Sequence, residues 1–417
     1  MIPRMKIAVF TTEFPALSET FVLNQVTGLL DRGHDVTVFS DRPRNDGLVH
    51  PDFQRYALIS RSRYPHMPRN RLLRLGKAPF RLCGMALRNP RRVIPALNVS
   101  RFGRDALSGR LLYWGAMLKD RPRFDAILAH FGPVGEFADS LRQAGMISGP
   151  LATVLHGVDV SAYPKATPGA YRDLFRRGEC FLPISEHWRR KLGELGCPEN
   201  RMEVHHMGVD TARYVYRARR RDKSQPLQLL VVGRMVEKKG VADALHAVAG
   251  LIEAGHDARL TIIGDGPLRE RLEQTKDALG LGDRVAFLGW RKQDYIARAM
   301  READILLAPS VTTESGDQEG IPVTIMEAMA CGMIVLSTWH SGIPELVEHG
   351  KTGLLVKERD REGITRTLID LAEASPEQWR RYSQAARLKV EADFDIASLN
   401  LELERKLRRM ALTAPVA

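Results

Sequence analysis

The stretch LQLLVVGRMVEKKGVADALHAVAGLIEAGHDARLTII, residues 227–263, contains one complete strand–helix–strand unit. Both ends are short apolar runs, as buried strands require, and the middle has apolar residues at helical spacing. A strand, a crossover helix and a second strand of this length form a parallel βαβ unit. The stretch therefore predicts an α/β fold with a parallel sheet covered by helices on both faces.

The same alternation continues along the chain in both directions. Towards the C-terminus we predict strands at 284–289, 304–310, 333–338 and 352–356, with helices at 266–280, 291–303, 321–332 and 342–350. Towards the N-terminus we predict strands at 6–10, 35–40, 124–131, 151–157, 180–185 and 202–208, with helices at 20–32 and 135–145. We therefore expect two doubly wound, Rossmann-like domains, with the ligand in a cleft between them at the carboxyl ends of the strands.

The boundary between the two domains is expected at YRARRRDKSQPLQ, residues 216–228, which is polar, charged and contains Pro226. We predict a first domain at 1–218, a second at 219–395 and a C-terminal helix or tail at 396–417. Two placements are open for the charged helix that follows residue 375: it covers a sheet edge, or it returns to the first domain.

Composition indicates a globular chain without disulfides or structural zinc. Of the 417 residues, 44% are hydrophobic and 27% are charged, which suits two domains with large cores. The apolar run at the N-terminus is too short for a signal peptide, and no run approaches the length of a membrane span. The cysteine pattern fits a reducing cytosol, so we predict a cytoplasmic protein. The four cysteines lie far apart, without metal-ligand spacing, at positions 83, 180, 197 and 331.

Positive charge is concentrated between residues 55 and 123, where 17 Lys and Arg residues oppose only Asp105 and Asp120. The net charge of this segment, +15, exceeds the +12 of the whole chain. Within it, residues 69–98 alternate arginines with apolar residues, which predicts amphipathic helices that bind an anionic membrane surface. A solvated basic face on a packed helix is the alternative. Nucleic acid is disfavoured because no nucleic-acid-binding motif accompanies the charge.

Two loops that follow predicted strands of the second domain can hold a nucleotide. In GRMVEKKG, residues 233–240, Gly233 permits close backbone approach while Arg234 and Lys239 can clamp a diphosphate. In GDGPL, Gly264 and Gly266 make a tight turn before a helix. The alternatives are two exposed basic residues and a purely structural turn.

A third loop and its helix, VTTESGDQEGIPVTIMEAMACG at 311–332, place Glu319 and Glu327 eight residues apart. Eight residues are just over two helical turns, so both carboxylates lie roughly on one side and can accept hydrogen bonds from two sets of hydroxyls. The amides of Ile321 and Val323 at the helix start can point at a phosphate.

Together these motifs carry a resemblance to a known family. GRMVEKKG, IIGDGPLRERLE, FLGW, EGIPVTIMEAMACGMIVLST and SGIPELVEHGKTGLLV resemble the C-terminal half of the retaining, GT-B-fold glycosyltransferases of family 4. Glu319 and Glu327 match the E-x7-E pattern of that family. FPALSETFVLNQVTGLLDRGHDV, AHFG, LHGVD and MGVD extend the resemblance into the first half, and the subgroup it suggests is that of colanic-acid-like or amylovoran-like exopolysaccharide transferases.

The resemblance implies roles at the matching positions. Arg234 and Lys239 would bind the donor diphosphate and stabilise the leaving nucleoside diphosphate. Glu327 would bind the ribose, Glu319 the transferred sugar, and His156 would face that sugar. Further donor-binding positions are expected at Gly233, Gly264, Gly266, Ile321, Pro322 and Val323. The base is expected near Gly289 and Trp290.

The first loop of the chain, TTEFPALSETFVLNQ at 11–25, has no glycine, although many relatives have a glycine-rich loop there. Its polar residues Ser18, Glu19 and Thr20 are candidates for binding the acceptor, as is His130 in AHFG. The alternatives are a capped helix start and a hydrogen-bonded loop histidine. Since no D-x-D follows a predicted strand, we predict no resident cofactor and no requirement for a metal.

The sequence thus predicts a retaining glycosyltransferase that moves a sugar from a UDP- or GDP-sugar to a lipid-linked oligosaccharide in exopolysaccharide synthesis, on the inner face of the cell membrane. Two alternatives remain open. One is another sugar enzyme with the same fold, such as a phosphorylase or an epimerase. The other is a non-enzymatic basic protein that binds membrane or nucleic acid.

Overall fold

The computed structural model describes residues 3–15, 20–43, 51–118 and 121–413, without the side chain of Pro51. It divides into two compact units. Unit 1 comprises Met1–Pro183, Arg189–His205 and Asn400–Ala417, and unit 2 comprises Ile184–Trp188 and His206–Leu399. The second passage of the chain into unit 2 thus lies at residue 206, before the predicted boundary at residue 218.

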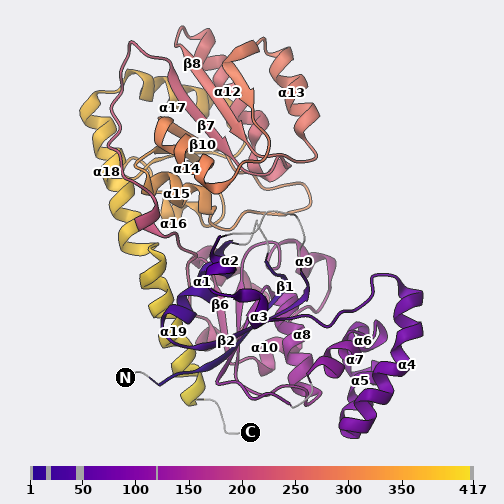
Figure 1. Ribbon diagram of the computed structural model, residues 1–417. Coiled ribbons are helices and arrows are strands. Elements are labelled where there is room, and N and C mark those ends of the chain that lie inside the picture. Colours follow the sequence, from indigo (N-terminus) through magenta and orange to yellow (C-terminus); the bar gives the residue numbers. More distant parts are fainter. Residues whose placement is uncertain (1–2, 16–19, 44–50, 119–120, 414–417) are drawn as a thin grey trace. The chain divides into compact units, whose positions relative to one another are not determined.

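Unit 1 is built on a parallel six-stranded sheet with strand order β3-β2-β1-β4-β5-β6 (Figure 1). Helices flank it, among them α1 (Thr20–Asp31) and α8 (Gly132–Gln143). The strands are β1 (Lys6–Glu13), β2 (Asp35–Arg42), β3 (Ser62–Arg63), β4 (Ala126–His130), β5 (Leu151–Leu155) and β6 (Cys180–Pro183).

Unit 2 repeats this architecture with strand order β12-β11-β10-β7-β8-β9, again parallel throughout. Its strands are β7 (Leu227–Val232), β8 (Ala258–Ile263), β9 (Val285–Phe287), β10 (Ile305–Ala308), β11 (Ile334–Thr338) and β12 (Leu354–Val356). Its helices include α12 (Val241–Glu253), α13 (Arg269–Ala278), α14 (Gln293–Glu302), α15 (Val323–Ala330), α16 (Ile343–Leu346), α17 (Arg361–Glu373) and α18 (Pro376–Asp393). The predicted α/β class with two doubly wound domains is confirmed.

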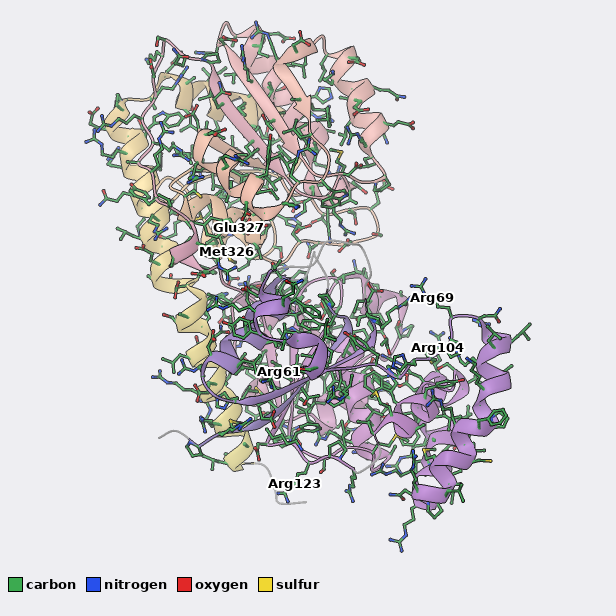
Figure 2. The ribbon with its side chains drawn as sticks, viewed as in Figure 1. Arg61, Arg69, Arg104, Arg123, Met326 and Glu327 are labelled. Carbon is green, nitrogen blue, oxygen red and sulfur yellow. The ribbon has the colours of Figure 1, made fainter. Side chains whose placement is uncertain are left out.

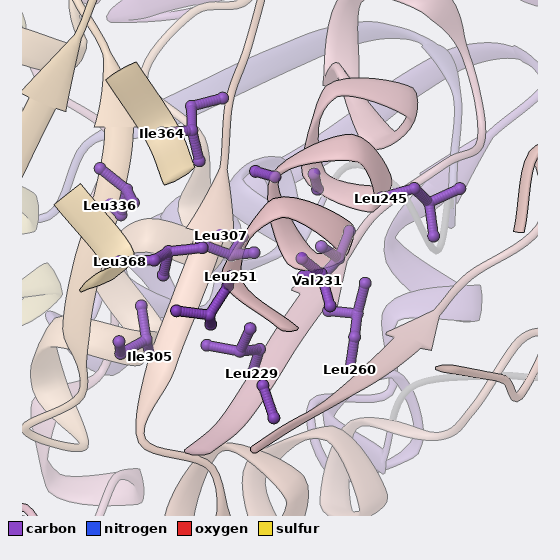
Figure 3. Packing of buried hydrophobic residues seen from close by; sticks show 14 of the residues in the cluster. Leu229, Val231, Leu245, Leu251, Leu260, Ile305, Leu307, Leu336, Ile364 and Leu368 are labelled. Atoms are coloured by element: carbon purple, nitrogen blue, oxygen red, sulfur yellow. The ribbon is translucent and has the colours of Figure 1, made fainter. Parts of the chain in front are cut away.

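The core of unit 2 explains why the quoted stretch folds as a βαβ unit. Leu229 of β7 and Leu260 of β8 are buried in one cluster with Leu245 and Leu251 of α12 (Figure 3). Leu368 of α17 joins the same cluster. Each such side chain contributes about 1.5–3 kcal/mol by leaving water, so the helical spacing in 241–253 fixes which face of α12 meets the sheet.

The predicted strand at 202–208 is wrong. Only Met202 forms an isolated bridge, to Phe181 of β6. Glu203 and His205 donate backbone hydrogen bonds to the carbonyls of Phe181 and Pro183, and there the pairing ends because the chain passes into unit 2 at His206. The extended, apolar-polar pattern is therefore that of a connecting segment.

Residues 206–219 belong to unit 2 because backbone hydrogen bonds tie them there. The amide of Val209 donates to the carbonyl of Phe394 over 3.0 Å, and the amide of Arg217 donates to that of Cys331 over 3.1 Å. The polar composition of 216–228 predicted a linker, but its first residues pack against buried parts of unit 2.

The C-terminal helix α19 (Ile396–Thr413) returns the chain to unit 1, which is one of the two predicted placements. Glu404 pairs with Arg32, and its Oε1 lies 3.2 Å from Nε2 of His34. His34 in turn accepts a hydrogen bond from the amide of Met5 through Nδ1. The helix thus completes unit 1 through buried polar contacts with the α1–β2 connection.

Candidate active site

The loops that follow β7 and β8 touch each other through their backbones. A Cβ atom at Gly264, whose φ is +136°, would lie 1.9 Å from the carbonyl oxygen of Gly233. A Cβ at Gly266 would lie 2.7 Å from the carbonyl oxygen of Met235. Both contacts exclude a side chain, so glycine is needed for the tight turn that the sequence predicted here.

Glu319, in the loop between β10 and α15, forms an ion pair with Lys239 of the loop after β7. Lys239 Nζ lies 2.9 Å from Glu319 Oε2. Lys238 Nζ lies 3.0 Å from Asp317 and 3.7 Å from Glu319 Oε1. Burial alone would raise the pKa of Glu319, but Lys239 and Lys238 hold it below its ordinary value. This carboxylate is therefore ionised at neutral pH.

One oxygen of Glu319 is left for a ligand. Its Oε1 is buried and accepts no hydrogen bond from the described residues. Arg234, from the loop after β7, is exposed, and its guanidinium forms no ion pair with any residue that the structure describes. The two charged groups expected at the donor diphosphate thus differ: Lys239 is paired and Arg234 is open.

The backbone of Glu319 is fixed by a histidine that sequence reasoning missed. The amide of Glu319 donates to Nε2 of His340 over 3.0 Å, and Nδ1 of His340 lies 2.6 Å from Oε1 of Glu358. Since Nε2 accepts, the ring proton is on Nδ1 and is donated to Glu358. The available signal was position: His340 comes shortly after the predicted strand at 333–338.

Glu327 lies in the second turn of α15 and is labelled in Figure 2. Neutral groups hold its carboxylate instead of lysines. The Tyr214 hydroxyl and the Gln293 amide each donate to its Oε1 over 2.8 Å. Burial raises the pKa of Glu327 to about 7, although these two hydrogen bonds oppose the rise. Tyr214 and Gln293 were not predicted, because both come from segments distant in sequence.

The start of α15 has open backbone donors. Pro322 occupies the N-cap position and supplies no side-chain cap, while Ile321 is buried just before it. The amide of Val323 is thus among the first helix donors, which favour an anion. This is where the sequence places the sugar and distal phosphate, and those roles stay predictions.

In unit 1, His130 and His156 form a hydrogen-bonded pair. His130 Nδ1 lies 3.2 Å from His156 Nε2. Burial lowers the pKa of both imidazoles, that of His130 to about 3, so both are neutral at physiological pH. The carboxylate of Asp159 accepts hydrogen bonds from the amides of His156 and Gly132 at 3.0 Å each, which anchors the loops that carry the pair.

The acceptor candidates are only partly visible. Ser18 and Glu19 lie outside the described residues. Thr20 is the first residue of α1, and the ring of its neighbour Phe21 lies 4.6 Å from that of His156, centroid to centroid. His130 is fully buried. Acceptor binding by these residues stays a prediction.

Neither a metal-ligand cluster nor a helix that could span a membrane is found in residues 3–15, 20–43, 51–118 and 121–413. Among the residues that the structure describes, no group of three or more His, Cys, Asp or Glu side chains could hold a metal ion. In the same residues, no helix is both long and apolar enough to cross a bilayer. Metal independence stays a prediction.

The basic segment forms a helix group at one side of unit 1, with α4 outermost (Figure 1). Arg69, just before α4, and Arg104, in α6, are labelled in Figure 2. Trp114 of α7 anchors it, because this ring is buried and stacks on Phe10 of β1 at 5.7 Å. The group comprises α4 (Arg71–Arg88), α5 (Val93–Leu97), α6 (Val99–Leu107) and α7 (Arg110–Met117).

Helix α4 exposes large apolar side chains. Leu72, Phe80 and Leu87 are 78%, 81% and 87% exposed. Their spacing of eight and seven residues places them on one side of the helix. Only Met85 of α4 is buried. An amphipathic helix normally buries its apolar face, so these side chains lack the packing that the rest of unit 1 provides.

Two parallel doubly wound sheets, with a glutamate paired to a basic loop after the first strand of the second sheet, match the architecture of the GT-B glycosyltransferases. The family model for glycosyl transferases group 1 matches residues 215–389, and that for Glycosyltransferase Family 4 matches residues 18–213. The chain belongs to the glycosyltransferase family that these two models describe.

Relatives narrow the subgroup. The chain is 36% identical to the protein of Salmonella typhimurium named as the colanic acid biosynthesis glycosyltransferase WcaL, over 97% of this chain and 100% of that one. It is 37% identical to the amylovoran biosynthesis glycosyltransferase AmsK of Erwinia amylovora, over 98% and 100%. Among solved structures, Anabaena HepE in complex with UDP and glucose aligns with a TM-score of 0.70 at 18% identity, covering 97% of this chain and all of that one. The expected exopolysaccharide subgroup is confirmed.

Proposed function

We propose that this protein is a retaining glycosyltransferase that moves a sugar from a UDP- or GDP-sugar to a lipid-linked oligosaccharide at the cytoplasmic face of the membrane. The observation that carries the proposal is the Lys239–Glu319 ion pair, which joins the loop after β7 to the loop before α15. It brings a cation for a diphosphate and a carboxylate for sugar hydroxyls to one place. The HepE complex with UDP and glucose supports the ligand class.

Charge complementarity supports the basic loop as the binding site of the donor diphosphate. As the glycosidic bond breaks, negative charge grows on the leaving nucleoside diphosphate. Lys239 and the open guanidinium of Arg234 would neutralise that charge, and the free amides at the start of α15 would add hydrogen bonds. These groups act without a metal ion.

The two glutamates would bind hydroxyl groups of the donor. Glu319 is ionised and has an unfilled buried oxygen, Oε1, which suits a hydroxyl of the transferred sugar. Glu327 would accept hydrogen bonds from the ribose. His156 is neutral, so it would orient the sugar by a hydrogen bond and would not act as a charged acid at neutral pH.

Helix α4 supplies the support for a membrane-bound acceptor. Leu72, Phe80 and Leu87 can enter the acyl boundary while exposed basic residues of the same helix, such as Lys77 and Arg88, meet anionic headgroups. Each basic residue near the surface contributes about 1 kcal/mol, and the attraction weakens with salt.

Nucleotide binding is tested first, by thermal unfolding with UDP, GDP and their sugars. A ligand at 100 times its dissociation constant stabilises the folded chain by about 2.7 kcal/mol, which gives a clear shift. The absence of any shift would favour the non-enzymatic basic protein. With the donor that binds, nucleoside diphosphate should accumulate only when a glycan acceptor is present; release without one would point to another sugar enzyme.

Membrane binding is tested by flotation with anionic and neutral vesicles. We expect the protein to bind anionic vesicles only. The Phe80→Glu variant should bind them with roughly tenfold lower affinity, since burying a phenylalanine contributes about 1.5–3 kcal/mol. Leu388→Glu is the matched control, because Leu388 is also exposed but lies on α18 of unit 2. Equal binding to both vesicle types, or an equal loss in the control, would contradict the membrane role.

A further inference from the structure

Tyr214 is placed to control how Glu327 meets its ligand. Its hydroxyl donates to Oε1 of Glu327 over 2.8 Å, and the Gln293 amide donates both to that oxygen, over 2.8 Å, and to the Tyr214 hydroxyl, over 2.9 Å. Two of the three protons in this triangle point to one carboxylate oxygen, and the third points to the tyrosine hydroxyl. The arrangement suits an ionised Glu327, which can only accept hydrogen bonds.

The other oxygen of the carboxylate is left open. No donor from the described part of the chain reaches Glu327 Oε2. This oxygen is also not fully buried, so a ligand can reach it. A carboxylate with one oxygen saturated and the other accessible is prepared for a donor from outside the protein.

The backbone of Tyr214 is itself fixed. Nη1 of Arg387, on α18, donates to the carbonyl of Tyr214 over 2.9 Å and to that of Ala330, the last residue of α15, over 2.8 Å. Arg387 thus ties the tyrosine to the helix that carries Glu327. The ring is buried, so its hydroxyl has little freedom to leave the carboxylate.

We propose that Tyr214, assisted by Gln293, is a positioning residue that fixes Glu327 through Oε1 and leaves Oε2 to accept the ribose hydroxyls of the donor. This inference rests on the proposed function, since it assumes a nucleotide donor. It adds two residues that the motif around Glu319 and Glu327 does not contain. Both come from other segments of unit 2, one before β7 and one at the start of α14.

The same contact sets the pH range in which Glu327 can serve. Tyr214 and Cys331, the latter directly after α15, are titratable groups near Glu327, and its charge adds to the burial that raises the pKa of each; Arg387 reaches carbonyls instead. Burial raises the pKa of Glu327 to about 7, and the two hydrogen bonds oppose that rise. Removing the Tyr214 hydroxyl will raise the pKa of Glu327 further. As the pH is lowered, the variant will therefore lose ribose binding at a higher pH than the wild type does.

The test compares ribonucleotides with nucleotides that lack the ribose hydroxyls. The full chain and its Tyr214→Phe variant are titrated calorimetrically with UDP, with GDP and with the 2′,3′-dideoxy forms of both, near pH 7 and pH 8.5. Tyr216→Phe is the matched control, because Tyr216 lies two residues further on and its hydroxyl makes no hydrogen bond to the described residues.

We expect Tyr214→Phe to bind the ribonucleotide about tenfold more weakly than the wild type near pH 7. At pH 8.5 the loss of affinity should be smaller, and the affinity for the dideoxy form should be unchanged at both pH values. Tyr216→Phe should match the wild type. Gln293→Ala, at an exposed position that tolerates change, should show the same selective loss if the tyrosine variant is unstable.

Two outcomes overturn the inference while the proposed function stands. One is a Tyr214→Phe variant that binds the ribonucleotide as tightly as the wild type does. The other is a Tyr214→Phe variant that loses ribo- and dideoxynucleotide affinity equally, which would indicate a merely structural role. If the wild type binds neither UDP nor GDP, the proposed function itself fails.

Discussion

Glu319 and Glu327 are eight residues apart, yet their surroundings are opposite. Lys239 and Lys238 surround Glu319 and hold its pKa below the ordinary value, whereas neutral donors surround Glu327, whose pKa burial raises to about 7. The first carboxylate keeps its charge across the physiological range and the second is close to losing it. The difference teaches that a shared residue type in one motif does not mean a shared electrostatic role.

The largest expected effect comes from breaking the ion pair that defines the Glu319 side. Lys239→Ala leaves a buried carboxylate without its partner and removes a cation from the diphosphate. We expect kcat for sugar transfer to fall roughly 10²–10³-fold, the range found when one group that stabilises developing negative charge is removed. Arg234→Ala should cause a similar loss at unchanged folding, measured by circular dichroism.

Lys238→Ala is the control on the same loop. Lys238 is closer to Asp317 than to Glu319, so its loss should cost less than tenfold in kcat. Full activity in Lys239→Ala or Arg234→Ala would refute the donor clamp.

A pH profile of nucleotide binding separates the two glutamates. Affinity of the wild type for its nucleotide should fall by up to about tenfold per pH unit below pH 7, because Glu327 gains a proton there while Glu319 does not. Glu327→Gln should bind weakly with no such slope, and Glu319→Gln should bind weakly with the slope preserved. Isothermal titration between pH 5.5 and 8.5 measures both. If the pH dependence of binding disappeared in Glu319→Gln and persisted in Glu327→Gln, the assignment of the slope to Glu327 would be wrong.

The smallest effect concerns stability. An acid whose pKa is higher folded than unfolded binds its proton more tightly in the native state, so ionisation opposes folding. For Glu327 this destabilisation grows from about pH 4.5 to pH 7 and is complete above that. Glu327→Gln should therefore raise the free energy of unfolding by about 1–3 kcal/mol at pH 8 and by nearly nothing at pH 4.

Urea unfolding of both proteins at the two pH values checks the prediction. Glu319→Gln provides the contrast: its ionised carboxylate is stabilised by lysines, so that variant should lose stability at pH 8. A Glu327→Gln variant that is less stable than the wild type at pH 8 would mean that the carboxylate is well solvated in the folded chain.

The fold was predictable from the sequence because it depends on local patterns. Short apolar runs that alternate with segments of helical periodicity predicted every strand of unit 2. Gly264 and Gly266 predicted the turn after β8, where close backbone contacts leave no room for a side chain. The segment 202–208 has the same apolar-polar pattern but lacks a neighbouring strand beyond Met202. A strand needs a partner, and the local sequence does not show one.

The site was predictable only where its residues lie in local sequence motifs. Lys239, Glu319 and Glu327 lie in recognisable motifs, whereas Tyr214, Gln293 and His340 reach them from separate segments. Nothing in the sequence near Tyr214 indicates that its hydroxyl meets a carboxylate 113 residues away. Such contacts follow from the packing of the sheet and its helices, which must be known first.

The return of α19 to unit 1 has a consequence for synthesis. Unit 1 receives its last piece, Asn400–Thr413, only after all of unit 2 has left the ribosome, although its six strands were made first. During that interval Arg32 and His34 lack Glu404, and the surface that α19 covers is open to other nascent chains. The first-made half of this protein is therefore the last to be finished.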